Sequence, residues 1–452
     1  NILRSDSLND GTDLDLLIPV ESKDLFENMM EEAGCRKVIS SSIDVFPHIE
    51  SYFLADGYGK RMFHFHVHTK IIFGHKHLKE YCVPLEEECL RARNHKTNVK
   101  IPFSECELFI HILRMAVKTF SPIRLMLPPY SIPDIYPSTS DMEELKFLIA
   151  NCEPKIFGAF VSRLQLKIDK EAVIRIGMGE YERFNVILWR IARSLKYYRR
   201  LSLLHLLWRL LKTNRVMRKI VGGGKILSNK KKLEKGFTAA IVGADGAGKT
   251  TILGKVEEFF KDKIDVDRVY LGSNKPGVGS RLFRVITLPL KAICLRLGKF
   301  LKLFAHIADI IVLLQECFYL KERKSRFQKA LRMARHGKLV FLERFPVPDV
   351  QDAGYELTSK EYKGYFDRIK REILGEYNNF GEVDVVIFLS VDPAIAVQRK
   401  PDHDINEVRR KAEQMEKKWQ QIKAARYVRI DATLPLDEVI AETINGIWNT
   451  RL

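Results

Sequence analysis

The sequence has few cysteines, and they show no spacing that organises cysteine chemistry. Among 452 residues there are 7 cysteines, with no C-x-x-C pair and no regular interval between them. This pattern excludes a disulfide framework of the kind that small secreted proteins use. We also expect no signal peptide at the start of the chain. Together these absences predict reduced thiols in a cytoplasmic protein.

Acidic residues are missing from one long window. Residues 183–233 contain no Asp or Glu, so the net charge of +18 is largely a local feature. Within it, residues 201–221 are apolar but too interrupted by charge to span a bilayer. Residues 196–232 could lie on an anionic membrane surface with Trp208 inserted. We favour a packing helix followed by a linker over 222–235, and nucleic acid is disfavoured because aromatic residues are sparse.

A second apolar stretch, residues 281–320, is studded with basic side chains and interrupted later by Asp309 and Glu316. It predicts one or two helices, started or kinked by Pro289. Membrane contact is one interpretation of this stretch. A pair of core-packing helices is the interpretation that we favour.

The length allows roughly two or three domains at ~150 residues each. We predict an α+β domain over residues 1–200, a basic amphipathic helix and linker over 201–235, and an α/β domain over 236–452. The last domain alternates strands with helices, which indicates a parallel sheet with helices on both faces. Its expected strands are 238–242, 268–271, 338–342, 383–389 and 427–431. Ligands bind beyond the carboxyl ends of such strands.

Two aspartates alternate near the start of the chain. Asp13 and Asp15 stand in an apolar segment, so on a strand both carboxylates share one face and could hold Mg²⁺ against a nucleoside triphosphate. A later expected strand, residues 62–72, carries histidines on alternate positions, which could form a metal face or the polar side of a strand. We favour the polar side. The alternating histidines are His64, His66 and His68.

The Asp-x-Asp element resembles the D-h-D motif of the nucleotidyltransferase superfamily, in which h is apolar. That resemblance implies a nucleotidyltransferase-like fold for the first domain, with Asp13 and Asp15 as magnesium ligands. The upstream Gly-Ser of that family is not visible, and histidines stand where its third carboxylate is expected. A degenerate domain that recognises substrate or only packs is therefore favoured over an active nucleotidyltransferase.

Residues 238–251, TAAIVGADGAGKTT, fit the phosphate-binding pattern G-x-x-x-x-G-K-[ST]. A short apolar strand precedes the glycines and a helical repeat of apolar residues follows, which is the context that the motif needs. Lys249 is expected to bridge the β- and γ-phosphates and Thr250 to ligate Mg²⁺. A glycine-rich turn that binds nothing is the disfavoured alternative. The expected phosphate contacts are Gly243, Ala244, Asp245, Gly246, Ala247, Gly248, Lys249, Thr250 and Thr251.

Charged residues follow two later strands. Glu343 and Arg344 come directly after strand 338–342, where a carboxylate can orient the waters of Mg²⁺ and a guanidinium can fork onto a phosphate. Further along, Arg399, Arg409 and Arg410 flank a short loop before a helix. They fit a lid that closes over the transferring phosphoryl group, and equally a solvated charged helix.

These motifs resemble thymidylate kinase and its nucleotide-kinase relatives. The shared segments are GADGAGKTT at 243–251, ERF at 343–345, LSVDPAIAVQRK at 389–400 and Ile-Asp-Ala at 430–432. The resemblance implies ATP as donor, an acceptor held by Arg344 and a lid over residues 399–410. It also implies that Asp245 contacts the sugar of the acceptor. Gly246 stands where some members carry a catalytic arginine, which makes Arg399 the first candidate for that charge.

The segments that read the thymine base in that family are absent or replaced, and Glu343 stands in place of its aspartate. The two-part layout also looks like thymidylate kinase-like proteins with a nucleotidyltransferase-like front half, some of them associated with bacterial surface-polysaccharide genes. We therefore predict an ATP- and Mg²⁺-dependent phosphotransferase acting on thymidine monophosphate, another nucleotide, or a sugar or polyol. The alternatives are a nucleotide-dependent protein of the membrane surface and a front-domain nucleotidyltransferase. A homodimer is left open.

Overall fold

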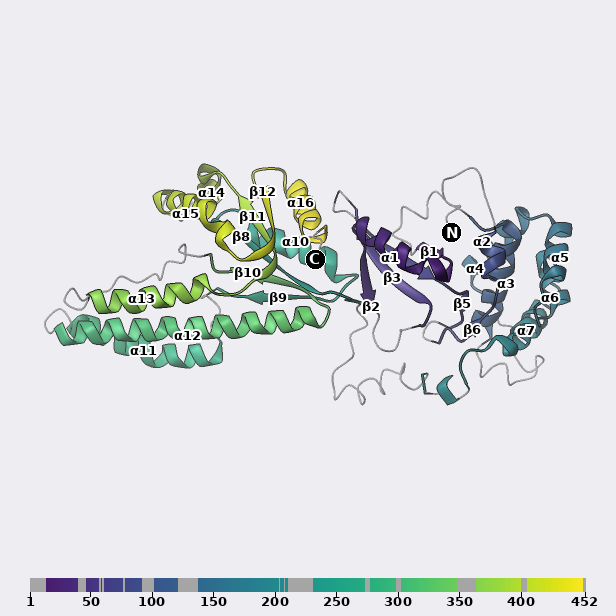
Figure 1. The fold of residues 1–452 in the computed structure, drawn as a ribbon, viewed down its shortest axis with the longest axis horizontal. Helices are drawn as coiled ribbons and strands as arrows, with labels where there is room; N and C mark the ends of the chain where they lie inside the picture. Colours follow the sequence, from purple (N-terminus) through teal and green to yellow (C-terminus); the bar gives the residue numbers. More distant parts are fainter. Residues whose placement is uncertain are drawn as a thin grey trace. The chain divides into compact units, whose positions relative to one another are not determined.

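The chain folds into two compact units (Figure 1). One contains residues 1–32, 39–52 and 64–229, which we call the front unit, and the other contains 33–38, 53–63 and 230–452, which we call the P-loop unit. The computed structural model describes residues 14–39, 46–56, 58, 61–75, 78–91, 101–120, 137–202, 204–206, 208–209, 231–272, 277–297, 302–347, 363–399 and 405–449.

A five-stranded sheet with the order β12-β11-β8-β10-β9 forms the centre of the P-loop unit. Every neighbouring pair in it is parallel, which confirms the predicted sheet. Its third strand, β8, is buried along its whole length, as expected when helices cover both faces. The strands are β8 (Phe237–Gly243), β9 (Val266–Tyr270), β10 (Leu339–Glu343), β11 (Val383–Ser390) and β12 (Ala424–Asp431).

The two faces of this sheet are covered by different helices. Ala239 and Ile241 of β8 share a core with α10 (Lys249–Lys261) and α16 (Leu436–Trp448). Ala240 and Val242, which point to the other face, share a core with α12 (Lys302–Arg335) and α13 (Lys363–Asn378). This two-residue alternation places consecutive strand residues in separate cores. The remaining helices are α11 (Val278–Leu297), α14 (Pro393–Arg399) and α15 (Ile405–Lys418).

A short early segment belongs to the P-loop unit although it lies about two hundred residues before β8. The guanidinium of Arg36 lies 4.2 Å from the ring centre of Phe237 and 5.4 Å from that of Trp448. It also donates hydrogen bonds of 2.8 and 3.0 Å to the carbonyl oxygen of Trp448. Stacking and hydrogen bonding of one side chain therefore fasten residues 33–38 to this unit.

A second five-stranded sheet has the order β1-β4-β3-β2-β7, and β1 runs parallel to β4. A separate antiparallel pair joins β5 to β6. The strands are β1 (Leu14–Leu17), β2 (Arg36–Ile39), β3 (Ile49–Ala55), β4 (Met62–His68), β5 (Ile72–Phe73), β6 (Tyr81–Cys82) and β7 (Lys232–Leu233).

Helices α2 and α4 to α7 share a hydrophobic core with α3, whose Leu108, Phe109 and Ile112 are fully buried. Ser104 is the first helical residue and Phe103 occupies the N-cap without a side-chain hydrogen bond. The helices are α1 (Lys23–Glu32), α2 (Glu86–Leu90), α3 (Ser104–Thr119), α4 (Thr139–Ala150), α5 (Pro154–Arg163), α6 (Lys170–Gly177) and α7 (Phe184–Ser194).

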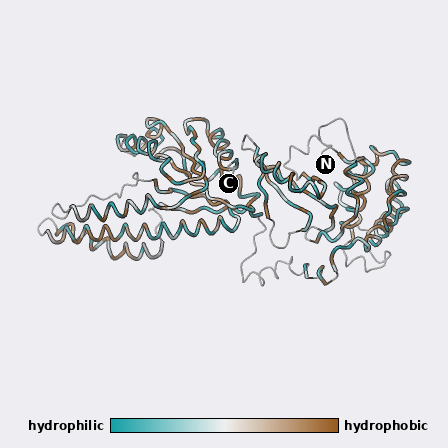
Figure 2. The backbone as a smooth tube through the Cα atoms, viewed as in Figure 1, coloured by the Kyte–Doolittle hydropathy of each residue, from teal (hydrophilic) through white to brown (hydrophobic). Residues whose placement is uncertain are grey.

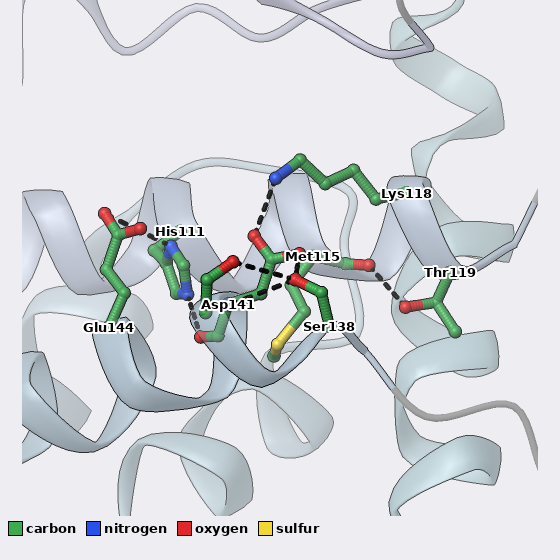
Figure 3. A network of polar contacts seen from close by, with 8 residues as sticks. His111, Met115, Lys118, Thr119, Ser138, Asp141 and Glu144 are labelled. Atoms are coloured by element: carbon green, nitrogen blue, oxygen red, sulfur yellow. Dashed lines mark hydrogen bonds and ion pairs between the residues drawn. The ribbon is translucent and has the colours of Figure 1, made fainter. Parts of the chain in front are cut away.

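A polar network fastens α3 to α4 (Figure 3). Lys118 donates a 2.6 Å hydrogen bond to Asp141, which also accepts one of 2.7 Å from the hydroxyl of Ser138. Nearby, the Nε2 atom of His111 donates to the carbonyl oxygen of Asp141 at 2.9 Å. Burial alone would raise the pKa of Asp141, but the hydrogen bonds from Lys118 and Ser138 hold that pKa below its usual value. Burial lowers the pKa of His111.

We predict that Asp141→Asn destabilises the protein by roughly 1–3 kcal/mol at pH 7, because charge-assisted hydrogen bonds to Asp141 are lost. An aspartate with a lowered pKa stabilises the fold above its unfolded value of about 3.9 and loses that effect below it. Urea unfolding at several pH values should therefore show a difference that shrinks below about pH 4. Glu143→Gln on the exposed side of α4 is the control, and an equal loss in both variants would contradict the prediction.

Most of the basic segment predicted over 196–232 lies outside the described residues, so its membrane contact stays a prediction. Among the helices that the structure describes, none is both long and apolar enough to cross a membrane.

Candidate nucleotide site

The glycine-rich loop forms a narrow backbone cradle between β8 and α10. Gly243, Gly246 and Gly248 have φ angles of +156°, +89° and +79°, which side chains with a Cβ rarely adopt. A Cβ on Gly246 would lie 2.5 Å from the carbonyl oxygen of Ala396, and one on Gly243 would lie 2.7 Å from that of Leu389. Only glycine fits at these two positions, so the loop lies against the backbone on both sides.

The start of α10 presents an anion site. Its N-cap is Gly248, which has no side chain to accept hydrogen bonds from the first turn of the helix. Backbone N–H groups and the helix dipole are then available to phosphate oxygens. Lys249 adds a positive charge directly above the loop, because its ammonium donates to the carbonyl oxygens of Gly243 at 2.8 Å and Ala244 at 2.7 Å.

Glu343 lies beside this cradle at the carboxyl end of β10. It pairs in register with Ile241 of β8 and is only 7% exposed. One carboxylate oxygen, Oε1, lies 3.5 Å from the hydroxyl oxygen of Thr250. The other oxygen, Oε2, accepts hydrogen bonds from Arg268 of 2.8 Å from Nη2 and 3.1 Å from Nε. Arg268 therefore orients the carboxylate, with Oε1 directed toward Thr250.

This oxygen pair fits a magnesium ion. Mg²⁺ prefers oxygen ligands and keeps several of its waters, so one hydroxyl and one carboxylate next to phosphates are a suitable set. Thr250 supplies the hydroxyl from the first turn of α10, and Glu343 supplies the carboxylate from the last residue of β10. Both were predicted as magnesium ligands from the sequence, and the structure brings them together.

Arg268 was not identified from the sequence as a site residue. It lies on β9 opposite Phe341 of β10, and Glu343 is two residues further along β10. Side chains at this diagonal position on neighbouring strands share one face and can reach each other. The sequence signal that could have identified it is a single arginine in a short, mostly apolar strand. This strand lies next to the strand that carries Glu343.

Asp245 and Arg344 lie across the mouth of the loop. The carboxylate of Asp245 is 3.6 Å from the guanidinium of Arg344 and 3.6 Å from the ammonium of Lys249. Arg344 directly follows β10 and has a φ angle of +56°, which turns its backbone away from the extended strand. The structure thus gathers four predicted residues, Asp245, Lys249, Glu343 and Arg344, around one loop.

The predicted lid residues lie on the next two helices. Ala396 of α14 touches the loop at Gly246, and Arg399 ends the same helix, where it donates to the carbonyl oxygen of Ala432 at 3.0 Å. Arg409 and Arg410 are exposed on α15. Residues 400–404 lie outside the described part of the chain, so closure over a phosphoryl group stays a prediction.

The structure describes only part of the site that the sequence predicts in the front unit. Asp13 lies outside the described residues, while Asp15 pairs in register with His66 and lies 3.5 Å from Nε2 of His68. His64 is buried, and Ser51 lies within 3.3 Å of Nδ1 of His66. No group of three or more His, Cys, Asp or Glu residues in the described ranges is arranged to hold a metal. The favoured interpretation of the histidine row as the polar side of a strand stays a prediction, as does catalysis by Asp13 and Asp15.

Known proteins match less than half of the chain in sequence. The uncharacterized ATP-binding protein YghR of Escherichia coli K12 is 26% identical over 223 residues, which cover 46% of this chain and 85% of that protein. Thymidylate kinase of Geobacillus thermodenitrificans is 25% identical over 225 residues, covering 46% and 88%. This region is kinase-like. Its parallel sheet, flanking helices and glycine-rich loop agree with a P-loop α/β fold.

Two further matches have the same extent. The uncharacterized ATP-binding protein YghS of Escherichia coli K12 is 23% identical over 226 residues, covering 46% of this chain and 91% of that protein. A deoxyadenosine kinase from M. mycoides, solved with bound dATP, is 18% identical over 46% of this chain and 98% of its own. Its TM-score of 0.26 is too low to support a structural conclusion. No protein-family model matches the chain.

Proposed function

We propose that the P-loop unit is an ATP- and Mg²⁺-dependent phosphotransferase that moves the γ-phosphoryl group to a nucleotide, sugar or polyol acceptor. One observation carries the proposal: Thr250 and the buried Glu343 approach to 3.5 Å beside a glycine cradle capped by Lys249. The kinase and the ATP-binding proteins among the relatives support ATP as the donor.

Different residues of the chain bind the phosphates, hold the metal ion and cover the transferred group. Loop amides and Lys249 hold the β- and γ-phosphates and neutralise charge as it moves between oxygens. Thr250 and Glu343 would hold a magnesium ion, which would supply further charge neutralisation. Arg399, with Arg409 and Arg410, covers the transferring group from α14 and α15 and excludes water, which limits hydrolysis.

The acceptor lies against the Asp245–Arg344 pair in this proposal. A guanidinium can bind a phosphate through two parallel hydrogen bonds, whereas a carboxylate accepts hydrogen bonds from hydroxyl groups. The pair therefore suits a nucleoside monophosphate, in which Arg344 binds the phosphate and Asp245 the sugar. It also suits a sugar or polyol bound through Asp245. Thymidine monophosphate stays one acceptor among these, because the expected base-reading segments are absent.

Incubation with γ-labelled ATP, Mg²⁺ and a panel of nucleoside monophosphates, sugars and polyols tests this function. We expect labelled product from one acceptor class, because the cradle, the proposed metal ligands and the acceptor pair all lie at the carboxyl ends of the parallel strands. Product should require Mg²⁺ and should decrease when Arg344 is changed to alanine. Tight ATP binding with no transfer to any member of the panel would contradict the proposal.

A further inference from the structure

The helix α11 packs against α12 along one side, as far as the described residues show. Phe283 stacks on Phe318 of α12 with ring centres 4.3 Å apart. One turn later, Thr287 accepts a 2.6 Å hydrogen bond from Gln315, and Cys294 packs in a small core with residues of α12. These contacts recur at helical spacing, so they lie along one stripe of α11. Figure 1 shows α11 lying alongside α12.

Several apolar residues of α11 outside this stripe are exposed. Val285 is 70% exposed, Ile286 64% and Ile293 53%, and Leu288 and Leu290 are each close to half exposed. These positions surround the helix on the sides away from its packed stripe. Figure 2 shows hydrophobic colouring along this helix and along the α12 segment beside it. A helix that is apolar on most sides normally lies within a core or against another apolar phase.

The helix α12 extends the same surface. Ile310, Leu314 and Phe318 are between 44% and 48% exposed and follow one another at four-residue intervals, which places them along one side of the helix. Phe318 also stacks on α11, so the two exposed sides are continuous. Together they form one apolar surface, which we call the hairpin surface. Exposed apolar surfaces of this extent are uncommon on monomers without a binding role.

Positive charge predominates around the hairpin surface. Residues 278–297 contain no Asp or Glu, whereas Arg281, Lys291 and Arg296 carry positive charge. On the neighbouring part of α12, Asp309 is only 2% exposed, and Glu316 is partly buried, which raises its pKa. Among the described residues of this surface, exposed positive charge therefore exceeds exposed negative charge.

We propose that the hairpin surface binds an anionic lipid membrane, with α11 lying in the plane of the interface. Apolar side chains enter the boundary between headgroups and acyl chains, while Lys291 and Arg296 contact anionic headgroups. Charge selects this occupant over a second copy of the chain. Stacking two copies of α11 would bring like charges together in an interface without acidic partners.

Flotation of the full chain with vesicles tests this inference. We expect binding to vesicles of phosphatidylcholine mixed with phosphatidylglycerol and at least tenfold weaker binding to phosphatidylcholine alone. Ile286→Asp and Ile293→Asp should each weaken binding by about tenfold or more, because each removes an apolar side chain that inserts into the membrane and adds a charge that anionic headgroups repel. The matched control is Ile156→Asp on α5, which is 50% exposed in the front unit and should not change binding.

Thermal unfolding and a charge-reversal variant distinguish loss of the binding surface from loss of folding. Unchanged thermal unfolding in the Ile293→Asp protein shows that lost binding comes from the surface, because this side chain is exposed in the folded chain. Lys291→Glu combined with Arg296→Glu should remove the preference for phosphatidylglycerol. The inference is overturned if both aspartate variants still float, or if the chain ignores vesicles and forms dimers that Ile293→Asp dissociates. Phosphotransfer is not part of these readouts, so the proposed reaction and this surface can fail separately.

Discussion

Changing Lys249 to alanine is expected to lower kcat/KM for phosphoryl transfer by about 10²–10³-fold, since removal of one charge-stabilising donor in other enzymes has effects of this size. The ammonium lies within 2.8 Å of two loop carbonyl oxygens, directly above the start of α10. It therefore lies at the glycine cradle where we propose that the β- and γ-phosphates bind. Steady-state kinetics with the acceptor found in the label-transfer assay, together with ATP binding by calorimetry, measure this effect.

Lys255→Ala is the matched control for that variant. Lys255 lies on the same helix and is exposed, and its ammonium lies 3.4 Å from the carboxylate of Glu258. Its loss removes the same charge from the protein without touching the cradle, so we expect kinetics within about twofold of the parent, as for surface substitutions in general. Equal transfer rates in the two variants would show that the cradle is not the site of the reaction.

Changing Glu343 to glutamine is expected to lower kcat/KM by about 10²-fold and to raise the Mg²⁺ concentration needed for half-maximal activity. The amide keeps the size of the side chain but removes the charge that pairs with Arg268 and faces Thr250. Breaking a buried ion pair also costs about 3–5 kcal/mol of stability at full burial, so unfolding has to be measured beside activity.

The double variant Arg268→Met with Glu343→Gln separates these two effects. Removing both charges avoids the penalty of one unpaired buried ion, so part of the lost stability should return. Activity should not return, because the metal ligand is still missing. Arg268→Met alone should weaken catalysis by a smaller factor, since Glu343 remains but loses its orientation. Recovery of full activity in the double variant would contradict a magnesium role for Glu343.

The predictions that the structure confirms concern short stretches of the chain. The strand, glycine turn and helix of the cradle depend on neighbouring residues, and positive φ angles explain why glycine stands at 243, 246 and 248. The parallel sheet was predicted from apolar runs alternating with helical repeats, and all five expected strands are present. Local backbone preferences and burial on both faces were sufficient for these features.

Other expectations depended on packing that a linear pattern does not show. The favoured interpretation of residues 281–320 as core-packing helices is only partly right, because α11 packs by one stripe and leaves its other sides exposed. Likewise, the grouping of residues 33–38 with the P-loop unit depends on Arg36 stacking on two aromatic rings that follow much later in the chain. The partners of these residues are far away in sequence, so periodicity could not identify them.

By itself the sequence determined the glycine-rich cradle at which we propose that phosphate binds, because the amides, glycines and lysine of the cradle are close neighbours along one segment. Only the tertiary structure decided how the carboxylate of Glu343 is aimed, since Arg268 approaches it from a strand formed by residues 75 positions earlier. It also decided that α11 presents its apolar sides to the surroundings. Both depend on which elements become neighbours in space, and that follows from the burial of the whole chain rather than from any local pattern.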